Sequence, residues 1–324
     1  MNTPFEMEKC PWDQTTYVGR WNYYFWVTNP MLCLKTDEEL EKAKSLRSSY
    51  LNGTLPPGTT TEQLLAAKQI YESSFHPDTG QKQNVFGRMS FQVPGGMAIT
   101  GAMLSFYKTV PAVVFWQWIN QSFNALVNYT NRNANSPLSQ TQMATAYGSA
   151  TIAACVTSIK FKQYLTNNAS PFFQRYVPFA AVAAANCVNI PLMRQTELLK
   201  GVDVYDADKN KVGCSKLAAA KGISQVIVSR IVMCAPGMVL LPVIMEKLEN
   251  KSTWFKRNTW IHAPFQTLAV GCFLIGMVPT ACALFPQFSS IKLSTLEKYE
   301  NAAYCDIVSN CKNPPAIVYS NKGL

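Results

Sequence analysis

Long stretches of this chain carry no charged side chain. Asp, Glu, Lys and Arg are absent from the runs 89–107, 109–131, 133–159, 176–193, 231–245 and 258–291. A helix that crosses a bilayer needs about 20 consecutive, mostly apolar residues. The pattern therefore predicts five membrane-spanning helices, at about 97–119, 142–160, 177–193, 223–245 and 262–285.

The segment before these runs has the pattern of surface helices. Residues 36–50 mix charged and apolar positions, and Thr36 with Glu39 matches a capping box at the helix start. A second helix is expected over about 61–75, before a turn composition at 76–80. Both helices are polar enough to face water.

These patterns predict an all-α, multi-pass membrane helical bundle of about five spans with an N-terminal helical soluble region. We expect a water-facing helical region at 1–88, a transmembrane domain at 89–285 and a C-terminal tail at 286–324. Five spans would place the two ends of the chain on opposite sides of the membrane.

Composition supports a membrane domain. Charged residues make up 15% of the chain, against roughly 25% in soluble domains, and no Asp or Glu lies between Asp78 and Glu197. A carboxylate in hydrocarbon costs about 2.5 kcal/mol or more, which explains such a gap. The alternative, core helices of a large soluble protein, fits 262–285 poorly because this run is too long and too apolar for an ordinary buried helix.

The net charge of +10 does not indicate a nucleic-acid partner. The basic residues are scattered, and no zinc-finger, RNA-binding or helix-turn-helix pattern accompanies them. The charge does not orient the protein either: nine Lys/Arg flank the predicted spans on one side and eight on the other, so the positive-inside rule does not decide. The N-terminus, with Glu6 and Glu8, is neither a secretory signal nor a transit peptide.

Candidate catalytic and metal-binding groups are few. Of two histidines, His76 has Asp78 nearby, but two ligands do not make a metal site, and we interpret His76 as a turn residue. The ten cysteines include no C-x-x-C pair, and Cys305 with Cys311 form a possible disulfide. No hydrolase, metalloprotease or nucleotide-binding motif is present, so we expect no enzyme activity and no cofactor.

Neutral amides follow one side of the segment FWQWINQSFNALVNYTN at 115–131. The amides are Gln117, Gln121, Asn124, Asn128 and Asn131, spaced 4, 3, 4 and 3 residues apart, with Asn120 one turn before Asn124. On a helix these positions form one continuous stripe. Amides can bond neighbouring membrane helices for about 0.6–2 kcal/mol each. They can also line a polar path, since they offer donors and acceptors without ionising. An unbroken row of six favours the path.

Further polar groups lie in other predicted spans. Asn186 and Asn189 share a face of the third span, which ends before Arg194. Arg230 lies inside the fourth span with no carboxylate nearby in sequence, and such a cation is a functional hypothesis by default. Prolines such as Pro236 and Pro279 are expected to interrupt helices near the membrane midplane, as they do in transporters.

Several segments of the chain resemble the sideroflexin family. They are FHPDTG at 75–80, FWQWINQSFNALVNYTNRN at 115–133, VPFAAVAAANCVNIPLMRQTEL at 177–198, LFPQ at 284–287 and the terminal NKGL. The similarity covers nearly the whole chain from Trp12 onward, and 91–97 and 236–249 are most similar to one branch of the family. Gln81 stands where the family usually has Glu, and the tail at 300–318 diverges.

The resemblance implies a multi-pass protein of the mitochondrial inner membrane, delivered by the mitochondrial import machinery without a cleaved presequence. It also implies transport of small neutral amino acids, serine above all, in support of one-carbon metabolism. The family name further implies a link to iron and haem handling.

We therefore hypothesise a transporter of a zwitterionic solute in the lipid bilayer, alone or as an oligomer. The expected substrate-binding residues are Gln117, Asn120, Gln121, Asn124, Asn128, Asn186 and Asn189, with Arg132, Arg194 or Arg230 holding the carboxylate. The lack of acids in the membrane region argues for facilitated or exchange transport rather than a proton relay. The alternative is a non-transporting membrane scaffold or regulator of iron or haem handling, in which the amides only pack helices together.

Overall fold

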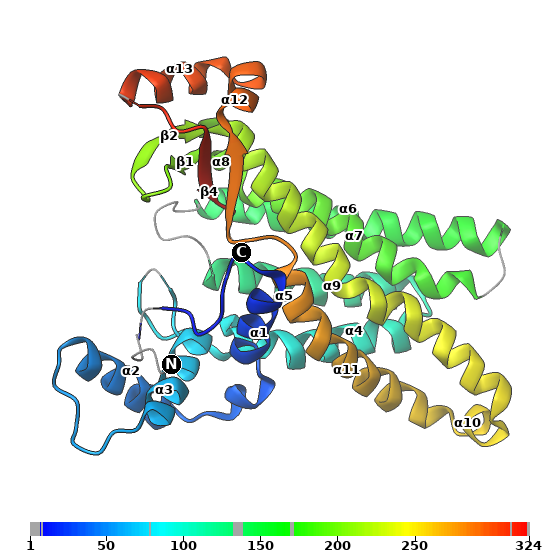
Figure 1. Ribbon diagram of the computed structural model, residues 1–324. Coiled ribbons are helices and arrows are strands. Elements are labelled where there is room, and N and C mark those ends of the chain that lie inside the picture. The colour runs from blue at the N-terminus through cyan, green and yellow to red at the C-terminus, as the bar shows by residue number, and fades with distance from the viewer. Residues whose placement is uncertain are drawn as a thin grey trace.

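The protein is mainly helical, and its long helices pack side by side in one bundle (Figure 1). The computed structural model describes residues 7, 9–77, 79–131, 139–168, 172–311 and 313–322. A group of short N-terminal helices and a small sheet lie at one end of the bundle (Figure 1).

Six helices form a closed ring. They are α4 (Gln92–Phe106), α5 (Val110–Thr130), α6 (Gln140–Asn168), α7 (Val177–Met193), α9 (Lys216–Lys251) and α11 (His262–Ala283). Each packs against the next in this order, and α11 closes the ring by packing against α4. Inside the ring, Met103, Val182 and Met238 form a buried cluster, with Trp116 and Cys234 packed against it.

The predicted span at 97–119 is not one helix. The chain leaves helical geometry at Tyr107–Thr109 and turns back, so α4 and α5 are separate helices. The cause is local: Thr109 caps α5 by accepting a hydrogen bond from Ala112 N at 3.3 Å, and Pro111 lies in the first turn, where its missing N–H costs nothing.

This break changes where the two ends of the chain are expected to lie. Six helices of alternating direction return the chain to its starting end, where Arg20 Nε of the N-terminal region donates to the carbonyl oxygen of Ala283 at 2.9 Å. Lys322, near the C-terminus, donates to the carbonyl oxygen of Phe285 at the same place, at 2.7 Å. Within the described residues, both ends therefore lie at one end of the bundle, contrary to the expectation from five spans.

Three helices of the described part are long and apolar enough to cross a membrane. They are the segments Phe173–Met193, Lys216–Lys251 and Thr259–Ala283. They include the predicted spans at 177–193, 223–245 and 262–285. The predicted span at 142–160 lies inside α6, but α6 is not among the three.

The prolines do not divide the long helices. Pro236 and Pro242 lie inside α9, and Pro279 lies inside α11, yet both helices continue past them. Each proline removes one backbone donor without ending the helix. Interrupted helix ends near the midplane, expected from these residues, are therefore not present in α9 and α11.

The all-α prediction missed a four-stranded antiparallel sheet. Its strands are β1 (Val202–Tyr205), β2 (Lys211–Ser215), β3 (Phe288–Lys292) and β4 (Ile317–Asn321), in the order β2-β1-β4-β3. In β3, buried and exposed residues alternate, and Ile291 packs with Val204, Val318 and Ile307 in one core. The predicted tail is thus folded with the segment between α8 and α9.

The remaining helices are short. They are α1 (Tyr17–Val27), η1 (Pro30–Leu34), α2 (Asp37–Leu51), α3 (Thr61–Ser74), η2 (Val85–Gly87), η3 (Met89–Phe91), η4 (Phe173–Tyr176), α8 (Gln195–Lys200), α10 (Thr253–Arg257), η5 (Thr259–Ile261), α12 (Leu293–Tyr299) and α13 (Asn301–Asn310). The capping box of Thr36 and Glu39 is confirmed at the start of α2. Cys305 in α13 and the following Cys311 are both free thiols, so the possible disulfide is not formed.

Close packing of α4 on α11 depends on small residues. A Cβ atom at Gly101 would lie 2.4 Å from Thr267 Oγ1 and 2.7 Å from Thr267 Cα, whereas one at Gly148 in α6 would meet nothing within 4 Å. We expect Gly101→Ala to lower the free energy of unfolding by about 1–3 kcal/mol through overpacking. Gly148→Ala should raise it by about 0.5–1 kcal/mol through helix propensity.

Thermal unfolding of the two variants in one neutral detergent checks this prediction. Equal shifts in the melting temperature, or a more stable Gly101→Ala variant, would contradict the packing described for α4 and α11.

Candidate functional site

A pocket of about 580 Å³ opens at the end of the ring opposite the chain termini. Its wall comes from the end of α4, from α6 and α7, and from the facing ends of α9 and α11. The volume lies within the usual range for small-molecule sites. The pocket is the first candidate for a solute entrance.

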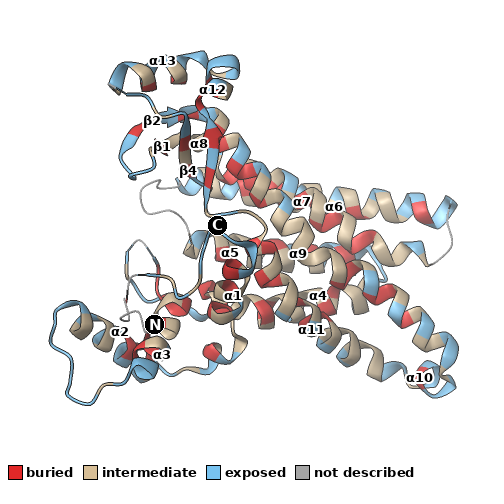
Figure 2. Ribbon diagram, viewed as in Figure 1, coloured by how far each residue is buried: buried red, intermediate tan, exposed pale blue. Residues whose placement is uncertain are grey.

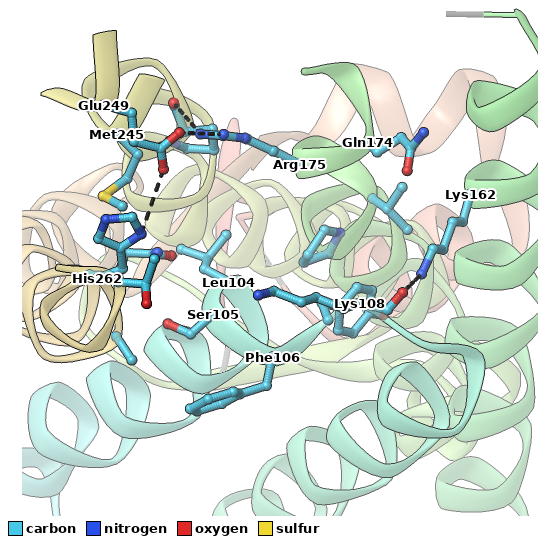
Figure 3. A pocket seen from close by; sticks show the side chains of 17 residues that line it. Leu104, Ser105, Phe106, Lys108, Lys162, Gln174, Arg175, Met245, Glu249 and His262 are labelled. Atoms are coloured by element: carbon cyan, nitrogen blue, oxygen red, sulfur yellow. Dashed lines mark hydrogen bonds and ion pairs between the residues drawn. The ribbon is translucent and has the colours of Figure 1, made fainter. Parts of the chain in front are cut away.

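One wall of the pocket holds a chain of ionisable groups, as Figure 3 shows. Arg175 Nη2 lies 2.9 Å from Glu249 Oε2, and Glu249 Oε1 lies 3.8 Å from His262 Nδ1. His262 is fixed on its other side, where Nε2 lies 3.0 Å from the carbonyl oxygen of Phe255. Residues from three separate elements thus place both signs of charge beside the cavity.

The opposite wall carries two lysines from different elements. Lys162 of α6 donates to the carbonyl oxygen of Lys108, in the turn between α4 and α5. This bond ties the turn to α6 at the pocket wall (Figure 3). Tyr107, in the same turn, also lines the pocket.

Tyr107 connects the pocket to the amide stripe. Its hydroxyl accepts a hydrogen bond from Gln117 Nε2 at 2.6 Å and lies 2.7 Å from Ser158 Oγ. Gln117 is completely buried. The polar groups therefore continue from the cavity into the interior of the ring.

The stripe keeps unfilled hydrogen-bonding capacity inside the ring. Gln117 Oε1 and Asn120 Nδ2 are buried without a hydrogen-bond partner in the described structure. Gln121 is also buried, and Asn124 and Asn128 are half-buried. A buried polar group left unpaired costs about 1–3 kcal/mol, so these atoms are not explained by helix packing.

Asn131, at the end of the stripe, uses its amide in hydrogen bonds that stabilise the packing of the bundle. Its Nδ2 donates to the carbonyl oxygens of Gly87 at 3.0 Å and Val127 at 2.9 Å, and its Oδ1 accepts from Gln83 at 2.8 Å. The stripe thus extends along α5 from Gln117, which bonds Tyr107 at the pocket end, to Asn131, which bonds Gly87 at the terminal end.

Helix α9 adds polar groups of the same kind. Gln225 Oε1 and Ser229 Oγ are buried without partners in the described structure. Arg230 is half-buried, and no hydrogen bond or ion pair joins it to the described residues; the titratable group close to it is the Cys282 thiol. One turn later, Cys234 packs against the cluster of Met103, Val182 and Met238.

The other predicted site residues have different surroundings. Arg194 Nε donates to Glu197 Oε2 at 3.0 Å, and Nη1 donates to the carbonyl oxygen of Lys322 at 2.6 Å, so Arg194 joins α8 to the C-terminal strand. Asn189 is buried and Asn186 is half-buried on α7. Arg132 lies outside the described residues. Of the two predicted arginines that the structure describes, Arg194 is paired, and Arg230 has no partner among the described residues.

The turn at 76–80 is local structure. His76 N donates to the carbonyl oxygen of Gln81, and Gly80 N donates to that of His76, both at 2.9 Å. Asp78 lies outside the described residues. No group of three potential metal ligands exists among the residues described.

Two cations cap the C-terminal end of α11, where carbonyl oxygens attract positive charge. Arg20 and Lys322 donate to carbonyl oxygens there. The pKa of Lys322 is lowered to about 8, mainly because the amine is buried; the Cys282 thiol opposes this shift, and Arg20 adds to it.

Stability should therefore depend on the charge of Lys322. The unfolded lysine, with a pKa near 10.4, keeps its proton between about pH 8 and 10.4, where the folded lysine has lost it. The contribution of Lys322 to the free energy of unfolding must then rise with pH across this window. We expect the stability of the wild type relative to Lys322→Met to be higher at pH 9.5 than at pH 7.5. Melting temperatures in detergent at the two pH values test this, and a constant or falling difference would contradict it.

The pocket residues were missed in the sequence because each lies at a helix end. Arg175 and Glu249 are 74 residues apart and belong to different helices. The sequence signals for a site here were weak. Arg175 precedes one apolar run, Glu249 follows another, and His262 lies at the start of a third predicted span.

Comparison with known proteins identifies the family. A family model described as "Sideroflexins" matches residues 6–324. The chain belongs to the sideroflexin family. Sideroflexin-2 of Drosophila melanogaster is 54% identical, covering 100% of this chain and 99% of the relative. Sideroflexin-2 of Homo sapiens is 54% identical, covering 99% of this chain and 98% of the relative. Sideroflexin-1 of Homo sapiens is 51% identical, covering 97% of this chain and 95% of the relative.

The relatives agree with the resemblance read from the sequence. The branch that 91–97 and 236–249 resemble is the sideroflexin-2 branch, whose members have slightly higher identity to the chain than sideroflexin-1. A search of the solved structures found no significant match.

Proposed function

We propose that this sideroflexin transports a small neutral amino acid, with serine as the first candidate, across the mitochondrial inner membrane. The observation that supports transport most directly is the set of unpaired polar groups on the ring helices α5 and α9. Gln117 Oε1, Asn120 Nδ2 and the Arg230 guanidinium have no partner among the described residues. Because each unpaired group is costly, a solute that completes their hydrogen bonds explains why the fold keeps them.

The chemistry of these groups fits a zwitterion with a small polar side chain. Arg230 would bind the carboxylate through charge-assisted hydrogen bonds. The acceptor Oε1 of Gln117 suits an ammonium or hydroxyl group, and Nδ2 of Asn120 suits a hydroxyl oxygen. A solute with net charge would lack a matching counter-charge along the amides.

In this proposal the pocket is one entrance and the amide stripe is the path. Tyr107 separates the two, since it lines the pocket and bonds Gln117. The six ring helices would each cross the bilayer, which places both termini on one side. We propose facilitated or exchange transport, because Glu249 at the pocket is already paired with Arg175.

Binding is tested with purified full-length protein in a neutral detergent. A ligand at 100 times its dissociation constant stabilises the folded state by about 2.7 kcal/mol. We expect L-serine and L-alanine to raise the melting temperature by several degrees, and L-glutamate and L-lysine to leave it unchanged. No shift with any neutral amino acid, or an equal shift with glutamate, would contradict the proposed site.

A further inference from the structure

The connection between α9 and α11 exposes a group of unpaired cations. Lys247, Lys251, Lys256 and Arg257 are all exposed. None of their side chains forms an ion pair or hydrogen bond with the described part of the chain. Of the two carboxylates in this segment, Glu249 pairs with Arg175 in the pocket, and Glu246 forms no ion pair with the described residues.

The same end of the bundle is basic as a whole. Over 107–109, 159–176 and 246–261, the sequence has eight Lys/Arg and two Asp/Glu, a net of +6. A positive excess of this size attracts a negative partner, since like charges held together repel.

Two tryptophans are exposed among these cations. Trp254 is 64% exposed and Trp260 is 74% exposed. The segment that carries them is anchored to the bundle through Phe255, which is buried. Phe255 stacks on His262 with ring centroids 4.6 Å apart, and it packs edge-on against Phe265 with centroids 5.6 Å apart. The Ser252 hydroxyl also caps α10, accepting from Phe255 N at 3.2 Å. The short helices α10 and η5 therefore present Trp254 and Trp260 outward.

The location of this group points to a bilayer surface. The connection that carries the group joins the ends of α9 and α11, two of the three helices in the described part that are apolar enough to cross a membrane. Figure 2 shows the exposed residues of α10 at the tip of the bundle, past the half-buried helix surfaces. Tryptophan prefers the headgroup level of a membrane, where its ring is half solvated. Basic residues beside it bind anionic lipid headgroups.

We propose that the connection from Lys247 to Trp260 binds the headgroups of anionic phospholipids in the leaflet at this end of the bundle. The four cations pair with headgroup phosphates, and the two indoles lie at the boundary between headgroups and acyl chains. The proposal rests on the membrane location of α9 and α11 and is independent of the transported solute.

The site distinguishes a lipid from a soluble anion. Free phosphate would use the cations but would gain nothing from the two exposed indoles. An anionic phospholipid uses both, because the same molecule offers a phosphate and an apolar chain a few ångströms apart. The test therefore includes both anions.

The test uses full-length protein purified in a neutral detergent and titrated separately with phosphatidylglycerol, phosphatidylcholine and inorganic phosphate. Lipid retained after gel filtration is counted by phosphorus analysis, and the melting temperature is recorded. The variant is Lys247→Gln/Lys251→Gln/Lys256→Gln/Arg257→Gln. The matched control removes four exposed cations elsewhere: Lys42→Gln/Lys200→Gln/Lys216→Gln/Lys292→Gln.

We expect wild type and control to retain phosphatidylglycerol in preference to phosphatidylcholine. Each cation near the surface contributes about fivefold in affinity, so the variant should bind phosphatidylglycerol at least twentyfold more weakly. Trp254→Ala/Trp260→Ala should weaken retention of both lipids alike. Equal retention of the two lipids by wild type, or an equal loss in the control, would overturn the proposal. Inorganic phosphate that stabilises the protein as well as phosphatidylglycerol would assign the cations to a soluble anion instead.

Discussion

Replacing Asn120 with leucine is expected to leave the protein folded and to reduce serine uptake at least tenfold. Asn120 Nδ2 is buried without a partner in the described structure, so leucine removes an unpaired donor and should keep or raise the melting temperature. A hydrogen bond to the solute worth about 1.4 kcal/mol corresponds to a tenfold change. Adding Gln117→Leu should lower uptake about a hundredfold in total, since two such bonds are lost.

Asn131→Leu is the matched control from the same stripe. Asn131 makes three hydrogen bonds, two of which join it to the segment before α4, so its loss should lower the free energy of unfolding by about 1–3 kcal/mol. If the amides were only packing contacts, Asn120→Leu would destabilise the protein as Asn131→Leu does. Unchanged uptake in a well-folded Asn120→Leu variant would remove Asn120 from the path.

Replacing Arg230 with glutamine is expected to produce the second large loss, about 10- to 100-fold in uptake. A charge-assisted hydrogen bond contributes about 1.5–3 kcal/mol, and the solute carboxylate loses this partner. The melting temperature should hold or rise, because the guanidinium has no partner in the described structure and its burial is costly.

Arg194→Gln provides the contrast for Arg230. It leaves Glu197, whose side chain is 17% exposed, without its ion-pair partner and cuts the bond to the C-terminal strand. We expect lower stability with little change in uptake per folded molecule. The opposite result, normal uptake in Arg230→Gln and a specific transport defect in stable Arg194→Gln, would exchange the roles of the two arginines.

Features set by neighbouring residues could be predicted from the sequence. The capping box of Thr36 and Glu39 and the helix at 61–74 follow from local hydrogen bonds. The amide stripe follows from spacing alone, because all six positions fall on one helix, α5 and its first following residue.

Features set by distant partners could not be predicted in this way. The sheet joins strands of four or five residues from 202–215 and 288–321, and so short an alternation does not stand out from a loop. The turn at Tyr107–Thr109 had a local signal, Thr109 before Pro111, but the apolar residues on both sides favoured a continuous span. Which amides remain unpaired is likewise a property of the packed ring, since Asn120 and Asn131 look alike in the sequence.

The central claim, that the amide-lined ring interior is a path for a neutral amino acid, is tested most directly by uptake of labelled serine into liposomes that contain the purified protein. The account predicts saturable uptake by wild type that alanine competes, that needs no imposed proton gradient, and that is lost in folded Asn120→Leu and Arg230→Gln variants. A folded wild-type protein that moves no more serine than protein-free liposomes would contradict it and support a non-transporting membrane scaffold.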